Sequence, residues 1–387
     1  MDSITAPRRM LIGGGSIARL AELLAGFGLS RPFIVTDRWL VSSGMIDRCL
    51  APLTAAGMPY RLFDETVPDP TDVVVAAGLD AFRAGDHDCI LGFGGGSPMD
   101  TAKAIAILAA TGGHIREQKV PRAADRAAVP VVCVPTTAGT GSEVTRFTVI
   151  TDTERGEKML IAGLGALPVA AVVDYELTLS LPPRTTADTG IDSLTHALEA
   201  YVSRRANPVA DMYAERAMRL IGPHLRRVYR DPEDRPAREA MMLGATLAGL
   251  AFSNASVALV HGMSRPIGAH FHVPHGLSNA MLLPVVTRYS LPAALPRYAA
   301  AARWIGCAEA GDADQLAGVK LLEELAALNA ELAVPSPAAY GIPADRWEAL
   351  LPLMADQALA SGSPANNPRV PDAAEIVALY RQAYGST

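Results

Sequence analysis

The chain has 387 residues, of which 50% are hydrophobic and 5% aromatic, and it carries a formal net charge of -6 with a pI near 5.8. This length allows two domains with substantial cores. The acidic balance provides no positive field for nucleic acid or for an anionic membrane surface, so neither is expected as a partner.

The spacing of the cysteines and the composition of the N-terminus predict the cellular compartment of the protein. Cys49, Cys89, Cys133 and Cys307 are widely scattered, without the close spacing of a zinc knuckle or a disulfide framework. Residues 1–10 are followed by glycines rather than by an apolar core, so no signal peptide is expected. No apolar run is long enough to span a membrane. We therefore expect a cytoplasmic protein with reduced thiols.

The first half of the chain alternates apolar strands with helical stretches. Strands are predicted at 32–37, 89–94, 129–135 and 169–174, and helices at 45–56 and 73–84. This alternation is typical of a parallel sheet with helices on both faces, which binds ligands at the carboxyl ends of its strands. Residues 1–181 are therefore predicted to form an α/β domain.

Three of the predicted strands end in polar or glycine-rich segments. The first ends at Asp37, whose carboxylate can accept hydrogen bonds from an adenosine ribose and repel a 2′-phosphate. Capping the next helix is an equally good interpretation of Asp37. The second strand runs into Gly94-Gly95-Gly96-Ser97 and a helix from Pro98. Because glycine lets the backbone approach a phosphate and a helix N-terminus attracts it, this segment favours a pyrophosphate cradle, although it is not the GxGxxG fingerprint.

The third strand is followed by a segment rich in hydroxyl groups, Pro135-Thr136-Thr137-Ala138-Gly139-Thr140-Gly141-Ser142-Glu143. Its threonines could hold the ribose and nicotinamide side of a dinucleotide, although a solvated Thr/Gly loop has the same composition. With the two preceding strand ends, the segment predicts a dinucleotide-binding domain.

Beyond Leu181-Pro182-Pro183 the pattern is helical almost throughout. Apolar residues recur at three and four positions in 209–220, 237–251, 316–328, 346–359 and 373–383. A helix is also predicted around 190–201, capped by Thr185, Thr186 or Asp188, and another around His261, capped by Asn254-Ala255-Ser256. Residues 182–387 are therefore predicted to form an all-α domain.

Metal-ligating side chains gather in two segments of this second half. Asp192 and His196 lie four apart on one helix face and can share a divalent cation, but such pairs also occur by chance on solvated helices. Four of the eight histidines then fall within residues 260–276. Among them, His261 lies in an apolar helical context, and His275 is expected on a turn between Pro274 and Gly276. Together the two segments predict a metal site.

These segments, with Gly94–Lys103 and Pro135–Glu143 upstream, resemble the iron-containing (group III) alcohol dehydrogenases over nearly the full length. The resemblance implies a dehydroquinate-synthase-like architecture and an enzyme that transfers a hydride between NAD(H) and an alcohol, aldehyde or ketone. It implies a homodimer or a larger homo-oligomer. It also implies that Asp192, His196, His261 and His275 bind Fe(II), although the ligands alone suit Zn(II) equally well.

The resemblance also implies a set of residues that bind the cofactor. Asp37 goes with a preference for NAD, and Lys158 matches a family lysine near the nicotinamide ribose. Relatives often have Asn at the position of Asp69, and Asp offers only acceptors where Asn also donates. The full set is Asp37, Asp69, Gly94, Gly95, Gly96, Ser97, Asp100, Thr136, Thr137, Thr140, Ser142 and Lys158.

The chain departs from the family at Arg265, where many relatives have a second histidine four residues after the first helix-borne ligand. Arginine stays protonated at neutral pH and cannot relay a proton. Either the relay passes through His270, His272 or water, or Arg265 holds an anionic group of the substrate, such as the carboxylate of a hydroxy acid or semialdehyde. Arg265 and His272 are therefore candidate catalytic residues beside the four metal ligands.

Two other functions compete with the dehydrogenase. A dehydroquinate-synthase-like lyase also uses NAD and a metal, but its ligand set and its substrate-binding residues are not visible in this sequence. In a non-enzymatic metal-binding or scaffold protein, the glycine, threonine and histidine motifs would all have no catalytic function. The expected partner of the dehydrogenase is a small alcohol or aldehyde.

Overall fold

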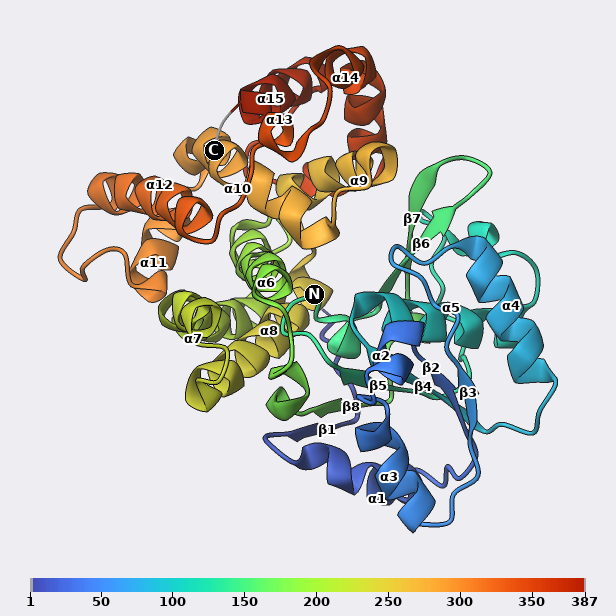
Figure 1. The fold of residues 1–387 in the computed structure, drawn as a ribbon. Coiled ribbons are helices and arrows are strands. Elements are labelled where there is room, and N and C mark those ends of the chain that lie inside the picture. The colour runs from blue at the N-terminus through green and yellow to red at the C-terminus, as the bar shows by residue number, and fades with distance from the viewer. Residues whose placement is uncertain (1–2, 386–387) are drawn as a thin grey trace. The chain divides into compact units, whose positions relative to one another are not determined.

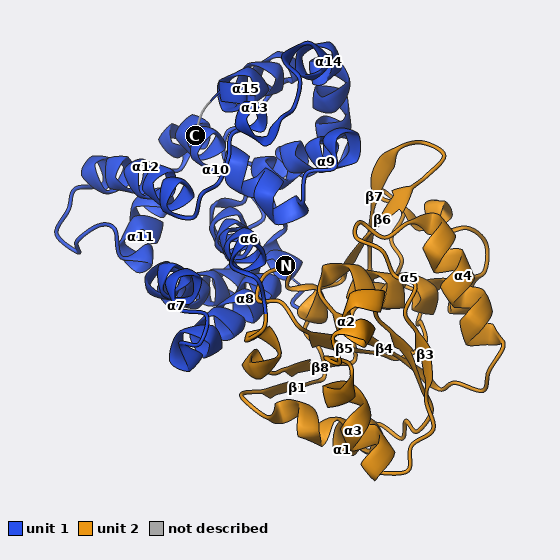
Figure 2. Cartoon of the chain, in the orientation of Figure 1, with its two compact units in different colours: residues 1–4, 181–387 blue, residues 5–180 orange. Residues whose placement is uncertain are grey.

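A computed structural model describes residues 3–385 of the chain. Its contacts divide the chain into two compact units, Thr5–Ser180 and a second unit that combines the residues before Thr5 with the chain from Leu181 onward (Figure 2). Within residues 3–385, every strand lies in the first unit, and the second is built from helices (Figure 1).

The first unit is organised around a parallel sheet of six strands in the order β1-β8-β5-β4-β2-β3. The strands are β1 (Arg9–Ile12), β2 (Pro32–Val35), β3 (Arg61–Phe63), β4 (Cys89–Gly94), β5 (Val131–Pro135) and β8 (Ala170–Val173). The four predicted strands correspond to β2, β4, β5 and β8, and the prediction of a parallel α/β sheet is confirmed.

Both faces of this sheet are covered because successive side chains of a strand point to opposite faces. Phe33 and Val35 of β2 pack into one hydrophobic core, and Ile34 between them packs into the other. Helices α4 (Asp72–Arg83) and α5 (Gly96–Thr111) contribute to the first core, and α1 (Leu20–Gly26) and α3 (Asp47–Ala55) contribute to the second (Figure 1). A near-continuous apolar strand such as β2 is stable only between two such layers.

An antiparallel hairpin, β6 (Phe147–Asp152) and β7 (Glu157–Ala162), follows the sheet strand β5 and was not predicted. It is anchored by Arg116, whose Nε and Nη2 donate to the buried carboxylate of Asp152 at 2.6 and 2.8 Å. The hairpin holds the far end of the hydroxyl-rich segment that follows β5.

The second unit consists of helices, as predicted. They are α6 (Pro183–Val202), α7 (Pro208–Arg230), α8 (Arg235–Ala255), α9 (Leu259–Phe271), α10 (His275–Ser290), α11 (Leu295–Ile305), α12 (Asp314–Glu331), α13 (Pro337–Tyr340), α14 (Ala344–Ala360) and α15 (Ala373–Gly385). Among the described residues no single helix has the length and hydropathy of a membrane span, and α8 with α9 meets those criteria only as a pair bent by 104°.

Three local predictions in this unit were wrong. Helix α6 begins at Pro183 without a side-chain cap, because proline is well suited to the first turn of a helix. Helix α8 continues to Ala255, and Ser256 ends it with φ 66°, so residues 254–256 do not cap α9. His275 is the first residue of α10 rather than part of a turn.

Candidate active site

Four side chains of the helical unit converge on one point. Helix α6 carries Asp192 and His196 one turn apart, α9 carries His261, and α10 begins with His275. The Nε2 atoms of His261, His196 and His275 lie 3.4, 3.8 and 3.8 Å from the same Oδ1 of Asp192. Atoms bound about 2.1 Å from a tetrahedral metal ion lie about 3.4 Å apart. The four residues therefore have the spacing of a divalent-metal site.

The four residues differ in their exposure. Asp192, His196 and His261 are 2%, 4% and 2% exposed, whereas the side chain of His275 is 37% exposed. A catalytic metal site keeps one position open to the substrate. Among the described residues, the cluster is thus open to solvent at His275 and enclosed around the other three side chains.

Glu199 on α6 orients His261 and also caps α9. Its Oε2 lies 2.6 Å from Nδ1 of His261, and its carboxylate accepts hydrogen bonds from the backbone N–H groups of Ala258 at 3.0 Å and Val260 at 2.6 Å. With Nδ1–H donating to Glu199, the lone pair of His261 Nε2 faces Asp192, which is the tautomer that binds a metal. Glu199 was not among the predicted site residues, although it follows His196 by three residues on the same helix face.

Close packing fixes the ring of His196 and the start of the helix that carries His275. The ring of His196 stacks against Phe252 with a centroid distance of 4.2 Å and against His261 at 4.5 Å. Beside His275, a Cβ on Gly276 would lie 2.3 Å from the carbonyl oxygen of Asp188. Only glycine therefore allows α10 to begin so close to the backbone of α6.

Asn279, one turn after His275 on α10, was also missed. Its Nδ2 lies 2.6 Å from Asp192 Oδ1, 3.1 Å from His261 Nε2 and 3.2 Å from His275 Nε2. Its Oδ1 is buried and has no hydrogen-bond partner among residues 3–385. A half-turn of the carboxamide would point this oxygen, a good ligand for a divalent cation, at the same three atoms. The orphaned oxygen supports the fit of a metal to this site.

The charges of the site also favour a cation. Burial alone raises the pKa of Asp192, but the imidazoles of His196, His275 and His261 outweigh this effect and hold that pKa well below its usual range. Burial lowers the pKa of His261, whereas Glu199 and Asp192 more than offset burial and raise it. The two carboxylates thus stabilise positive charge among these side chains.

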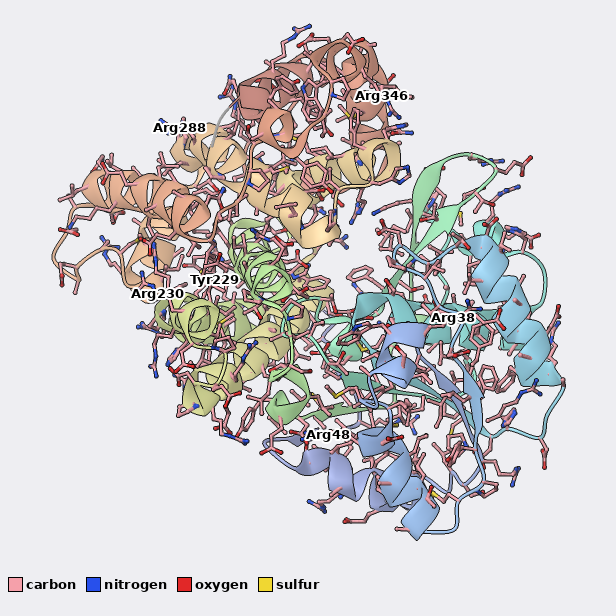
Figure 3. The ribbon with its side chains drawn as sticks, in the orientation of Figure 1. Arg38, Arg48, Tyr229, Arg230, Arg288 and Arg346 are labelled. Carbon is pink, nitrogen blue, oxygen red and sulfur yellow. The ribbon has the colours of Figure 1, made fainter. Side chains whose placement is uncertain are left out.

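The remaining predicted residues of this segment lie along or just beyond α9. Arg265 is one turn after His261, 8% exposed, and donates from Nη1 to Ser363 Oγ at 2.9 Å. The ring of His270 contacts Gln357 Oε1 at 2.8 Å, and Arg346 (Figure 3) donates to its backbone oxygen. His272 is exposed and ends α9 with φ 56°.

In the first unit, the two predicted phosphate and ribose segments lie against each other. Gly94 at the end of β4 has φ 147°, and a Cβ there would lie 2.6 Å from Pro98. A Cβ on Gly95 would meet Thr137 at 3.4 Å, and one on Gly96 would meet Thr140 at 3.0 Å. Because these residues are glycines, a ligand can contact the protein backbone between the turn and the threonines. This position is the N-terminus of α5, where backbone N–H groups lack intrahelical acceptors.

Unsatisfied hydroxyl groups mark the same edge of the sheet. Thr137 Oγ1 is buried and has no hydrogen-bond partner within the described chain, and the same holds for Thr36 Oγ1 after β2 and Thr66 Oγ1 after β3. Buried hydroxyls are usually hydrogen-bonded. The orphaned hydroxyls at the carboxyl ends of parallel strands fit a dinucleotide with many acceptors and donors.

Asp100, Ser142 and Lys103 form a buried network that shapes this edge. The carboxylate of Asp100 accepts from Ser142 Oγ at 2.7 Å and from Val149 N at 2.9 Å. Lys103 Nζ donates to Ser142 Oγ at 2.9 Å and to the backbone oxygens of Thr145 and Phe147. Polar atoms of Asp100 and Ser142 are thus engaged within the protein, together with Lys103, which was not among the predicted site residues.

Two acidic residues of the predicted set have partners of their own. Asp37 caps α2 (Arg38–Ser42), since its Oδ1 accepts from Leu40 N at 2.9 Å. Asp69, in the left-handed region at φ 51°, places Oδ1 2.6 Å from Nζ of Lys158, whose side chain is 5% exposed. The predicted role of Asp37 as a helix cap is therefore confirmed, and this hydrogen bond uses only its Oδ1. Lys158 is buried in an ion pair rather than exposed.

The sheet edge and the buried Asp/His cluster together define a nucleotide-dependent metalloenzyme, and comparisons with known proteins agree. Residues 7–175 match the model of the iron-containing alcohol dehydrogenase family, and residues 186–384 match its C-terminal model. The NAD-dependent methanol dehydrogenase of Bacillus methanolicus is 35% identical over 384 residues, 99% of this chain and 100% of that protein. The 1,3-propanediol dehydrogenase of Citrobacter freundii is 37% identical over 387 residues, 99% of each chain. A 1,3-propanediol oxidoreductase crystal structure matches with TM-score 0.94 and 36% identity, covering 99% of this chain and 100% of that one.

The chain belongs to the iron-containing alcohol dehydrogenase family. The predictions of this family, of an alcohol or aldehyde oxidoreductase and of iron with NAD as its cofactors are confirmed. The alternative of a dehydroquinate-synthase-like lyase is not favoured.

Proposed function

We propose that this chain interconverts a small alcohol and its aldehyde or ketone, with a divalent metal held by Asp192, His196, His261 and His275. The observation that carries the proposal is the convergence of three imidazole Nε2 atoms on a single oxygen of Asp192. One carboxylate with three imidazoles suits both Fe(II) and Zn(II), and family membership makes iron the first choice. Bound there, the cation supplies a Lewis acid for the substrate oxygen.

The residues around the ligands have separate tasks in this proposal. Glu199 holds His261 with its Nε2 lone pair toward the metal, and Phe252 holds the plane of His196. The exposed side of His275 admits the substrate. His272 stays the candidate for passing the alcohol's proton to solvent, since the ring of His270 is engaged by Gln357.

We propose that the sheet edge of the first unit binds NAD. The turn Gly94-Gly95-Gly96-Ser97 takes the pyrophosphate at the N-terminus of α5, and Thr136, Thr137 and Thr140 hold the ribose and nicotinamide side. The free oxygen of Asp37 accepts from the adenosine ribose. Bound there, NAD would supply the hydride acceptor or donor, and Asp100, Ser142 and the Asp69–Lys158 pair act by shaping the site.

The division of labour between the two units follows from these sites. We propose that residues 1–181 act as the dinucleotide-binding domain and residues 182–387 as the metal-binding catalytic domain. A cytoplasmic location is supported by Cys49, Cys89, Cys133 and Cys307, which are free thiols. We also propose a homodimer or larger oligomer without nucleic-acid or membrane partners.

A coupled measurement of NADH and metal tests this function. Purified protein is depleted of metal, reloaded with Fe(II) or with Zn(II), and incubated with NAD and a panel of small alcohols. The expected result is net NADH, seen by its near-ultraviolet absorbance, that requires the added metal. A lyase or a scaffold protein releases no net NADH. If no alcohol of the panel yields net NADH, the proposal is refuted.

A further inference from the structure

We propose that Arg265 forms an anion subsite beside the metal centre, and that the preferred substrates are alcohols or aldehydes that carry a carboxylate a few carbons from the reacting group. This inference rests on the proposed function and names the substrate class of the same site. The reaction itself is unchanged: the alcohol carbon gives its hydride to NAD, the hydroxyl gives up its proton, and the carboxylate takes no part in the bonds that break.

The first observation is a buried guanidinium that forms no ion pair within 4.0 Å among the described residues. Arg265 is 8% exposed, and a guanidinium has five N–H donors. Among residues 3–385 its side chain makes one hydrogen bond, to the neutral hydroxyl of Ser363, and no ion pair. Burial lowers the pKa of Arg265 to about 10, so the group keeps its charge at neutral pH. A buried charge of this kind is costly unless an anion faces it.

The second observation is the position of Arg265. It lies four residues after His261 within α9, so both side chains project from the same face of the helix, one turn apart. Ser363 precedes a short 3-10 helix, Pro364–Asn366, that packs directly on α9, since a Cβ on Gly262 would lie 2.8 Å from Pro364. The guanidinium is thus held in place by packed backbone, one turn from a metal ligand.

The third observation is the balance of charge. A divalent cation and Arg265 bring three positive charges to this region. Asp192 and Glu199 supply two negative charges, and the neighbouring Asp188 is paired with Arg184 at 2.5 Å. With neutral imidazoles as ligands and the substrate hydroxyl still protonated, one positive charge is left over. A carboxylate on the substrate neutralises it, and a bidentate contact with arginine is stronger than a hydrogen bond between neutral groups.

Charge compensation of Glu199 is the competing role for Arg265. Glu199 does attract Arg265 electrostatically. However, both carboxylate oxygens of Glu199 already accept hydrogen bonds, from Ala258, Val260 and His261. No ion pair within 4.0 Å joins Glu199 and Arg265 among the described residues. A purely compensating arginine would affect neutral and acidic substrates alike, and this difference can be measured.

The kinetic test uses matched substrate pairs, 4-hydroxybutyrate with 1-butanol and 3-hydroxypropionate with 1-propanol. For the unmodified enzyme, kcat/KM is expected to be higher for the acid of each pair. In Arg265→Met the ratio of acid to neutral kcat/KM should fall about 10- to 100-fold, mainly through KM. Arg288→Met, at an exposed position of α10 (Figure 3), serves as the matched control and should leave the ratio as it is.

A binding measurement gives a readout that does not depend on turnover. Calorimetry with glutarate as the probe is run on the Zn(II)-loaded enzyme, on Arg265→Met and on Arg288→Met. Glutarate should bind at least tenfold more weakly to Arg265→Met alone. Equal binding to all three proteins means that the carboxylate contacts only the metal, and overturns the subsite.

Two further results keep the inference testable if Arg265→Met does not fold. Ser363→Ala leaves the guanidinium but removes its hydrogen-bond acceptor, and should raise KM for the acid of each pair more than for the alcohol. In the unmodified enzyme, a higher kcat/KM for the neutral alcohol of both pairs overturns the proposal. If no alcohol yields NADH, the proposed function fails, and the glutarate measurement still decides whether Arg265 binds an anion.

Discussion

Glu199 Oε2 lies 2.6 Å from Nδ1 of His261, and the same carboxylate caps the first turn of α9. One side chain from α6 therefore sets both where α9 begins and which nitrogen of His261 faces the metal. Carboxylates in this position fix the orientation and tautomer of a metal-bound histidine and raise its basicity.

Glu199→Gln should weaken metal binding about 10- to 100-fold. Glutamine can accept with one atom only, so its NH2 group must face either the N–H of Val260 or both the N–H of Ala258 and Nδ1 of His261. In the second case the proton of His261 moves to Nε2 and blocks the ligand atom. The measurement is metal retention against increasing chelator concentrations. Glu215→Gln, which changes an exposed carboxylate paired with Arg219, is the control and should retain metal normally.

His261→Ala and His275→Ala should both lower metal content and activity, but only one of them should respond to added imidazole. The side chain of His275 is 37% exposed, so free imidazole can enter the space left by its removal. The side chain of His261 is 3% exposed, and its loss leaves the buried carboxylate of Glu199 without its imidazole partner, with only the backbone N–H groups of Ala258 and Val260 as donors. His261→Ala should therefore also lower the thermal midpoint more. Full metal occupancy in both variants, by elemental analysis, contradicts the ligand assignment.

Sequence patterns predicted the elements that are determined by residues close to one another in the chain. Strands β2, β4, β5 and β8 were found because apolar runs are bounded by polar or glycine residues, and the metal ligands were found because Asp and His are concentrated in two short segments. The glycine turn and the threonine segment were also assigned to one edge, because parallel strands end on the same side of a sheet.

Features that depend on distant residues were missed or assigned wrongly. The cap of α9 comes from Glu199, about sixty positions earlier in the chain. No residue close to 258 in the sequence indicates this cap. The hairpin of β6 and β7 is held by Arg116 and by its own register rather than by a strong apolar alternation. Helical periodicity, applied from His196 to Glu199 and from His275 to Asn279, was the available signal for the two missed residues near the metal site.

Asp37→Ser should relax the preference for NAD over NADP without unfolding α2. Serine is as good an N-cap as aspartate, so the hydrogen bond to Leu40 N is kept while the charge that repels a 2′-phosphate is removed. Asp37→Gly, which also removes the cap, should give the same change in cofactor preference with a small loss of stability. The measurement is kcat/KM for both cofactors.

The control for Asp37 is Asp47→Ser, which removes an exposed carboxylate from the first turn of α3. It changes the net charge equally and should not change the cofactor ratio. If the unmodified enzyme uses NAD and NADP with equal efficiency, Asp37 acts only as a helix cap.

Lys103→Met should destabilise the first unit and weaken NAD binding together. Burial lowers the pKa of Lys103 and raises that of Asp100, and their mutual attraction opposes both effects. Methionine fills similar space but leaves Asp100 buried without a cation and the backbone oxygens of Thr145 and Phe147 without their donor. Breaking a buried charge pair on one side costs about 3–5 kcal/mol.

The same change releases Ser142 and the segment that carries Thr140, so the dissociation constant for NADH, followed by fluorescence, should rise. Lys320→Met is the control, because Lys320 pairs with Asp312 at 2.7 Å on the helical unit and is partly exposed. It should leave NADH binding unchanged and should lower the free energy of unfolding by no more than about 1 kcal/mol. Unchanged NADH binding by a stable Lys103→Met protein would show that the network is structural and does not position the cofactor loop.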